Sequence, residues 1–166
     1  MPARLLALPL LNLVECCWDI FREGVEAPQI GSVVYCDLAA GYADHSGIYV
    51  GNNQIVHLDG NGCIEVASPK RFVRRLHGFN TAISIYISCK NKDAVGSDQV
   101  AQRALDMSGE KIPYNVFLNN CHRFTSCCLS GNSRSSFKCM WMLKAETRKI
   151  LGSDNWRVWK NHPIPD

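Results

Sequence analysis

A sixteen-residue segment that predicts a β-hairpin constrains the fold of this chain more than any other feature. Segment 45–60 reads HSGIYVGNNQIVHLDG, in which two apolar runs flank a Gly-Asn-Asn cluster at 51–53. Runs rich in β-branched and aromatic residues favour strands, and Gly and Asn favour a tight turn between them. His45 then stands at the start of one strand and His57 near the end of its partner. The hairpin therefore predicts a sheet on which two histidines meet across the ladder.

Cys121 lies in a segment that predicts a helix beginning at the cysteine itself. Asn120 is a favourable N-cap, Phe124 and Cys128 follow on the same face, and Gly131 is a typical C-terminal stop. A thiol in the first helical turn lies near unpaired backbone N–H groups and the positive end of the helix dipole. Both favour the thiolate, and the same N–H groups could hold an oxyanion. The alternative is a small, buried, apolar residue, as most free cysteines are.

One cysteine and two histidines are the components of an acyl-transfer triad. A thiol becomes a useful nucleophile only when a base takes its proton and a third group orients that base. Taken singly, each histidine is more often a packed or surface residue of a strand than a catalytic one. Taken together, Cys121, His45 and His57 predict a Cys-His-His enzyme.

Three separated motifs resemble those of a known family. H-x-x-I-Y-V-G at 45–51, a second histidine twelve residues after the first, and N-C-x-x-F at 120–124 resemble the lecithin:retinol acyltransferase family, a circularly permuted branch of the NlpC-type papain-like superfamily. VAQRALDMSG at 100–109, followed by Tyr114, resembles the helix and tyrosine that precede the nucleophile in this family. The resemblance covers about residues 31–131. It implies a papain-like α+β fold, with an antiparallel sheet and the nucleophile at a helix N-terminus.

The resemblance also implies roles for individual residues. Cys121 would be the nucleophile, His45 the general base and His57 the residue that orients His45. No cofactor is implied, and the leading substrate is a phospholipid-like acyl donor with water or an amine as acceptor. The chain departs from the family where Glu and then His commonly follow the nucleophile, because His122 and Arg123 stand there. Either could lower the pKa of the thiol, but we expect His122 to be an exposed helix residue without a role.

Two other functions remain open at this stage. One is a cell-wall-type peptidase or amidase, as NlpC relatives are, since ester and amide hydrolysis use the same triad. The other is a catalytically silent binding module of the viral H-box/NC kind, since triad residues alone do not establish turnover.

The pattern of the chain predicts one catalytic domain with two attachments. An amphipathic helix is expected within 1–25, the catalytic domain at 26–131 and a helical C-terminal tail at 132–166. Besides the hairpin, the expected elements are strands at 33–36, 63–66 and 83–87 and helices at 98–108, 121–130 and 137–151.

The nine cysteines do not suggest a disulfide framework. Their number is odd, the pairs at 16–17 and 127–128 are adjacent, and no secretory pattern accompanies them. A reducing, cytoplasmic location is therefore expected. No C-x-x-C or H-x-x-x-H spacing occurs in the sequence, so no metal site is expected.

Two surface features concern membranes. Segment 10–21 has the apolar spacing of an amphipathic helix, which we expect to pack on the domain, with a membrane surface as the alternative. A basic cluster should form the solvated face of a short helix capped by Ser68, with weak peripheral contact to anionic headgroups as the alternative. The basic cluster consists of Lys70, Arg71, Arg74 and Arg75. Nucleic acid is not an expected partner, because no binding motif accompanies this charge.

Overall fold

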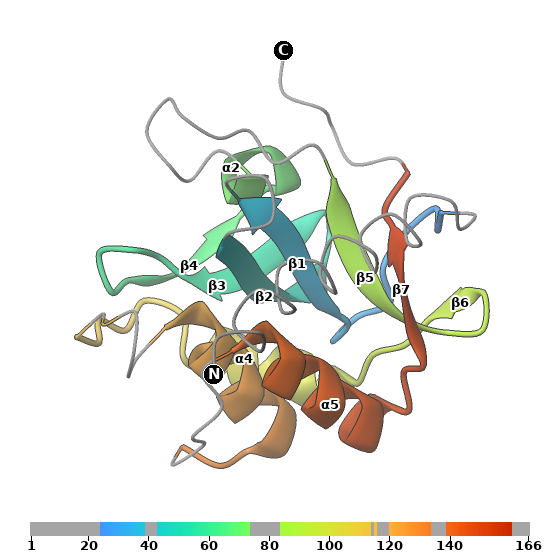
Figure 1. The fold of residues 1–166 in the computed structure, drawn as a ribbon. Helices are drawn as coiled ribbons and strands as arrows, with labels where there is room; N and C mark the ends of the chain where they lie inside the picture. The colour runs from blue at the N-terminus through green and yellow to red at the C-terminus, as the bar shows by residue number, and fades with distance from the viewer. Residues whose placement is uncertain are drawn as a thin grey trace, which may run out of the picture.

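A seven-stranded sheet forms the centre of the molecule (Figure 1). The computed structural model describes residues 24–38, 43–73, 84–113, 115, 120–133 and 139–160. The strand order is β4-β3-β2-β1-β5-β6, with β7 also paired to β5, and all these pairings are antiparallel. The strands are β1 (Val33–Leu38), β2 (Ala43–Gly51), β3 (Gln54–Leu58), β4 (Ile64–Ala67), β5 (Ile85–Lys90), β6 (Asp93–Ala94) and β7 (Asn155–Val158). The antiparallel sheet and the α+β class predicted from the sequence are confirmed.

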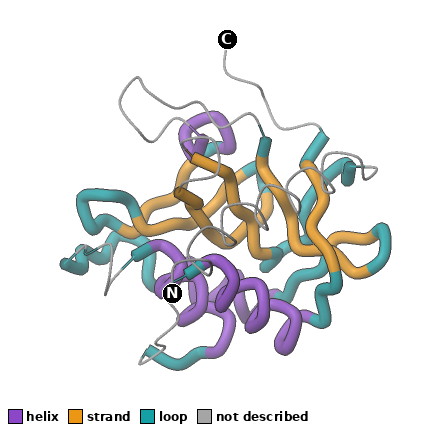
Figure 2. Tube along the Cα trace, in the orientation of Figure 1, coloured by secondary structure: helices purple, strands orange, loops and turns teal. Residues whose placement is uncertain are grey.

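The helices lie on both faces of this sheet (Figures 1 and 2). They are α2 (Pro69–Val73), α3 (Asp98–Asp106), α4 (Cys121–Ser130) and α5 (Met140–Leu151). Helix α2 lies on one face and the other three on the opposite face. Helix α4 has the predicted bounds, and its end is closed by Gly131 in a left-handed conformation with φ of 70°. Ser68 caps α2 as predicted, because its Oγ accepts the backbone N–H of Arg71 at 3.3 Å.

Alternating residues of the strands build a separate apolar core on each face. Ile48 and Val56 belong to the core beneath the three long helices, whereas Tyr49 and Ile55 belong to the core that Phe72 of α2 completes. This period of two is the expected signature of a sheet covered on both faces. Complete burial of a side chain such as Ile48 stabilises the fold by about 1.5–3 kcal/mol. The central hairpin is thus held from both sides.

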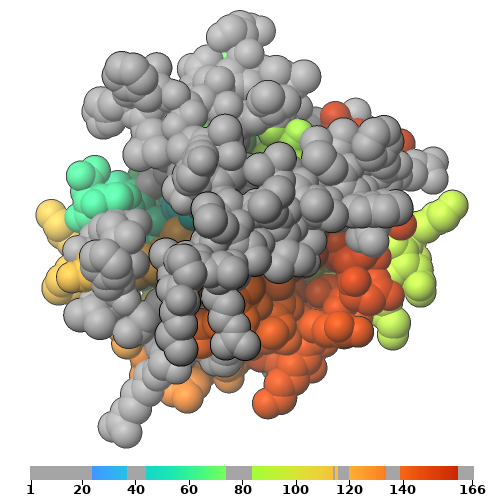
Figure 3. All heavy atoms as spheres, viewed as in Figure 1, coloured from blue at the N-terminus to red at the C-terminus, as the bar shows by residue number. Residues whose placement is uncertain are grey.

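The C-terminal segment contributes a strand as well as the expected helix. Strand β7 pairs with β5, placing Val158 opposite Tyr86. Trp156 packs edge-on against Tyr35 of β1, with ring centroids 5.1 Å apart. Helix α5 and the turn between β5 and β6 lie at the surface of the face seen in Figure 3. The sequence analysis predicted neither β6 nor β7, because both are too short to show a clear period.

Two sequence expectations fall on residues outside the described ranges: the amphipathic helix at 10–21, and Arg74 and Arg75 of the basic cluster. Among the described helices, none is long and apolar enough to cross a membrane.

Candidate active site

The two hairpin histidines lie side by side on the sheet face that carries α2. His45 Nε2 is 3.0 Å from His57 Nδ1, and the rings meet edge to face at 85°. Both side chains are buried, and Phe72 packs against both, with ring centroids at 4.8 Å and 5.3 Å. The hairpin therefore brings the two imidazoles into direct contact, as its pattern predicted.

The local sequence explains this contact. Asn52 and Asn53 both have positive φ, of 51° and 58°, which is the conformation of a type I′ turn. Gly47 lies beside His57, where an added Cβ would approach Val56 O to 2.7 Å and His57 Cβ to 3.1 Å. A larger residue at this position would therefore clash with the backbone of β3 next to His57.

Cys121 is the first residue of α4 and meets the edge of β2. Asn120 caps the helix as predicted, with its Oδ1 accepting the backbone N–H of Arg123 at 3.0 Å. Cys121 Sγ lies 3.8 Å from the carbonyl oxygen of Asp44, and Ser46, two residues further along β2, is among the neighbours that lower its pKa. Both β2 residues precede the stretch in which β2 pairs with β3. Residues two apart in a strand direct their backbone groups to the same side. The sulfur therefore lies beside the part of β2 that precedes its pairing with β3.

The thiol is flanked from both faces of the sheet. Successive side chains of a strand point to opposite faces, so His45 and Ser46 flank this edge from opposite sides. His45 belongs to the α2 side, where it contacts Phe72. Ser46 faces α4, where its Oγ is 3.0 Å from Thr125 Oγ1.

The pKa of Cys121 is lowered although the side chain is only 4% exposed. Burial is the largest single influence and raises the pKa. Coulombic attraction to His45 and hydrogen bonds to His45 and Ser46 together outweigh it. Burial raises the pKa values of Cys89 and Cys128 to about 12, although Arg157 and Arg103 oppose the shift. The arrangement thus favours a thiolate at Cys121 alone among these three buried cysteines.

Comparison with known proteins supports the same conclusion. Residues 26–134, about two-thirds of the chain, match the family described as lecithin retinol acyltransferase. The chain belongs to the lecithin retinol acyltransferase family. The match contains the hairpin and the whole of α4, including all three predicted site residues. Members of this family are acyltransferases, which supports an enzyme. Among curated proteins, none matches the chain significantly.

Glu65 lies next to the histidine pair. It lies opposite His57 in the β3–β4 ladder, with Oε1 3.5 Å from His57 Nε2. Its Oε2 is 2.5 Å from Arg71 Nη2. A carboxylate only accepts, so it favours the proton on His57 Nε2 and leaves Nδ1 to accept from Nε2–H of His45. In this arrangement Nδ1 is the nitrogen of His45 that is left to interact with the thiol.

His122 is buried, so the expectation of an exposed helix residue was wrong. Its side chain is 7% exposed, and its Nδ1 lies 2.9 Å from Ser46 Oγ and 4.0 Å from Cys121 Sγ. The error arose because position 122 belongs to the helix turn that docks on β2. Burial lowers the pKa of His122, and the negative charge of Asp44 opposes this shift only in part. The imidazole is therefore neutral at neutral pH.

Sequence reasoning also missed Glu65 and Ser46. Ser46 carried a weak signal, since it directly follows His45 and so had to face the other side of the strand. Glu65 lay in a predicted strand, but only the register of β4 against β3 places it beside His57.

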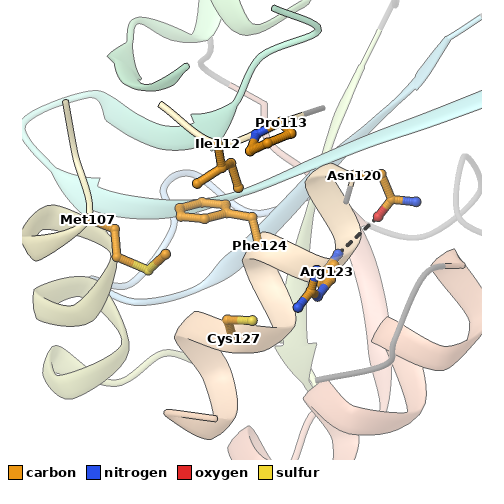
Figure 4. A pocket seen from close by; sticks show the side chains of 7 residues that line it. All are labelled: Met107, Ile112, Pro113, Asn120, Arg123, Phe124 and Cys127. Carbon is orange, nitrogen blue, oxygen red and sulfur yellow. Dashed lines mark hydrogen bonds between the residues drawn. The ribbon is translucent and has the colours of Figure 1, made fainter. Parts of the chain in front are cut away.

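A mainly apolar hollow of about 220 Å³ opens beside the first turn of α4. Figure 4 shows Met107, Ile112 and Phe124 turned toward one another around it. Asn120 and Arg123 lie at one end of the hollow. Cys121 does not line it, and its Sγ lies against the carbonyl oxygen of Asp44 on β2. The hollow thus begins within one residue of Cys121.

All seven cysteines in the part of the chain that the structure describes are free thiols. Within the same residues, no three His, Cys, Asp or Glu side chains form a group that could hold a metal ion.

Proposed function

We propose that this protein is a thiol-dependent acyltransferase or hydrolase in which Cys121 forms a thioester with the acyl group of a phospholipid-like donor. The observation that carries the proposal is the position of Cys121 between His45 and Ser46 at the start of α4, with its pKa lowered despite burial. Membership of an acyltransferase family supports the same reaction class.

The reaction would begin with transfer of the Cys121 proton to His45 Nδ1. The thiolate attacks the acyl carbonyl carbon, and backbone N–H groups of the first turn of α4 hold the resulting oxyanion. The tetrahedral intermediate collapses to the thioester, and the leaving alkoxide takes the proton from His45. Water or an amine then attacks the thioester, giving its proton to His45, from which the thiolate of Cys121 regains it as it leaves.

His57 and Glu65 would act by orienting the base. His57 accepts from His45 Nε2–H and so keeps Nδ1 directed at the thiol. Glu65 favours the required tautomer of His57 and stabilises positive charge on the histidine pair during proton transfer.

A phospholipid-like donor is favoured by the apolar lining of the hollow beside Asn120. At about 220 Å³ it is smaller than most complete ligand sites, and so suits a segment of an alkyl chain. Of the open alternatives, a peptidase would use the same triad but has no observation of its own in its favour.

Mass spectrometry of Cys121 tests the proposal. The protein would be incubated with vesicles of a diacyl phospholipid, and in parallel with a cell-wall-type peptide, before peptide mapping. We expect a fatty-acyl adduct on Cys121 in wild type and none in Cys121→Ser. A peptidyl adduct would reverse the substrate class. If neither pool gives an adduct and the Cys121 thiol is no more reactive than the other cysteines, a catalytically silent binding module would be favoured.

A further inference from the structure

A buried polar cluster lies on the side of Cys121 away from His45. Ser46 and Thr125 are fully buried, and His122 nearly so. Ser46 Oγ lies 2.9 Å from His122 Nδ1 and 3.0 Å from Thr125 Oγ1. None of these three side chains transfers a proton or holds the acyl group in the reaction steps above. Buried polar side chains are costly to desolvate, so a cluster of three calls for an explanation.

The number of protons that these side chains can donate limits the hydrogen bonds within the cluster. Thr125 Oγ1 donates its single proton to the carbonyl oxygen of Cys121 at 2.9 Å. Thr125 therefore has no second proton to donate to Ser46. Ser46 has one proton of its own, and its Oγ can receive a second from a neutral His122 whose Nδ1 is protonated. In that arrangement the Ser46 hydroxyl can donate its own proton to a third group.

The Cys121 thiolate is the negatively charged acceptor next to this hydroxyl. His122 Nδ1 lies 2.9 Å from Ser46 Oγ and 4.0 Å from Cys121 Sγ, and Ser46 is among the neighbours that lower the pKa of Cys121. A hydroxyl donating to an anion makes a stronger bond than one donating to a neutral oxygen. When Cys121 ionises, the Ser46 hydroxyl thus gains more by donating to Sγ than to Thr125.

We propose that Ser46 and His122 form a second arm that positions and stabilises the Cys121 thiolate, in which His122 Nδ1–H donates to Ser46 Oγ and the Ser46 hydroxyl donates to Sγ. Ser46 and His122 are then positioning residues that act from the opposite face of β2 to His45. The catalytic meaning of this arm rests on the proposed function, but its effect on the thiol exists without turnover.

The ionisable groups around the thiol are few among the described residues. His45 and Asp44 approach it from β2, and His122 from α4 itself. Arg103 of α3 and Glu146 of α5 contact α4 only in its later turns. A change in the titration of Cys121 on substitution of Ser46 therefore reports the arm itself.

The test is the pH dependence of Cys121 alkylation, followed by peptide mass spectrometry of the full chain. Ser46→Ala should raise the pH midpoint by about one unit, which lowers the alkylation rate well below that midpoint about tenfold. Ser88→Ala is the matched control, because Ser88 is an equally buried strand serine whose Oγ bonds to backbone groups of Val33 and Val95. It should leave the profile of Cys121 unchanged.

Two His122 variants test whether His122 Nδ1–H donates to Ser46. They also test the arm if Ser46→Ala does not fold. Asn places its amide nitrogen near the position of Nδ1, so His122→Asn should keep the wild-type midpoint. His122→Leu fills similar space without a donor and should shift the midpoint upward like Ser46→Ala. The arm is refuted if Ser46→Ala matches Ser88→Ala, or if the Asn and Leu variants shift equally. Loss of the acyl adduct in wild type would instead refute the proposed function while leaving these shifts in place.

Discussion

Glu65 lies directly opposite His57 in the β3–β4 ladder and approaches its outer nitrogen to 3.5 Å. The contact continues a line of polar groups that runs from the thiol through two imidazoles to a carboxylate and on to Arg71 at the surface. Apart from the thiol, which begins α4, every group in this line lies on strands β2, β3 and β4 or on α2. The orientation of His45 is thus set by the sheet rather than by a loop.

Substitution of Glu65 tests this line. Glu65→Gln should lower kcat about tenfold and leave KM nearly unchanged, since a neutral amide stabilises positive charge on the histidines less well. The alkaline limb of the pH–rate profile should also move to lower pH, an effect that mere loss of stability does not produce. Arg71→Gln is the control, because it removes the surface partner of Glu65 but keeps the carboxylate; it should change kcat much less.

The nucleophile is tested by Cys121→Ser, which should lower turnover by about 10³-fold or more while circular dichroism shows an intact fold. A serine hydroxyl is far less acidic than a thiol and would not be ionised beside His45. Cys139→Ser changes an exposed thiol and should retain full activity. Near wild-type turnover in the Cys121 variant would exclude a thioester mechanism.

The two histidines should differ in their effects. His45→Ala removes the base and should lower kcat by about 10²–10⁴-fold. His57→Asn should lose less, because its amide oxygen can still accept from His45 Nε2–H near the position of Nδ1. Steady-state kinetics of both variants on one acyl substrate provide the comparison. The reverse order of activities would mean that the two roles have been exchanged.

The hollow beside α4 can be tested by filling it. Cys127 lines it and is only partly buried, so Cys127→Phe should reduce its volume without opening the core. We expect kcat/KM for a long-chain acyl donor to fall about tenfold, with a short-chain thioester unaffected as the internal control. Equal loss on both substrates would show that the hollow does not hold the chain.

Membrane contact is tested with anionic vesicles. Each basic side chain near such a surface contributes about 1 kcal/mol, and salt screens most of it. Arg74→Gln with Arg75→Gln should therefore weaken sedimentation with vesicles at low salt and lower lipid turnover together. Hydrolysis of a soluble thioester should not change. If wild type fails to sediment even at low salt, the basic cluster is a solvated face only.

The sequence predicted the parts of the site that are local and missed those that depend on register. The turn residues and apolar runs of the hairpin were enough to bring His45 and His57 together, and Asn120 was enough to start α4 at Cys121. His122 was misplaced because helical spacing alone does not show which turn of α4 docks on a strand edge. Glu65 and Ser46 acquire their partners from strand pairing and helix docking, which a single sequence does not specify.

Strand β7 has a practical consequence for anyone shortening this chain. The family match ends at residue 134, yet α5 packs on α4 and β7 pairs with β5 beyond it. A polypeptide cut at 134 would lose Leu143 and Trp156 from the apolar core and would leave one side of β5 unpaired over Tyr86–Cys89. Unpaired strand edges recruit other chains, so the segment recognisable by homology should precipitate where the longer polypeptide stays in solution.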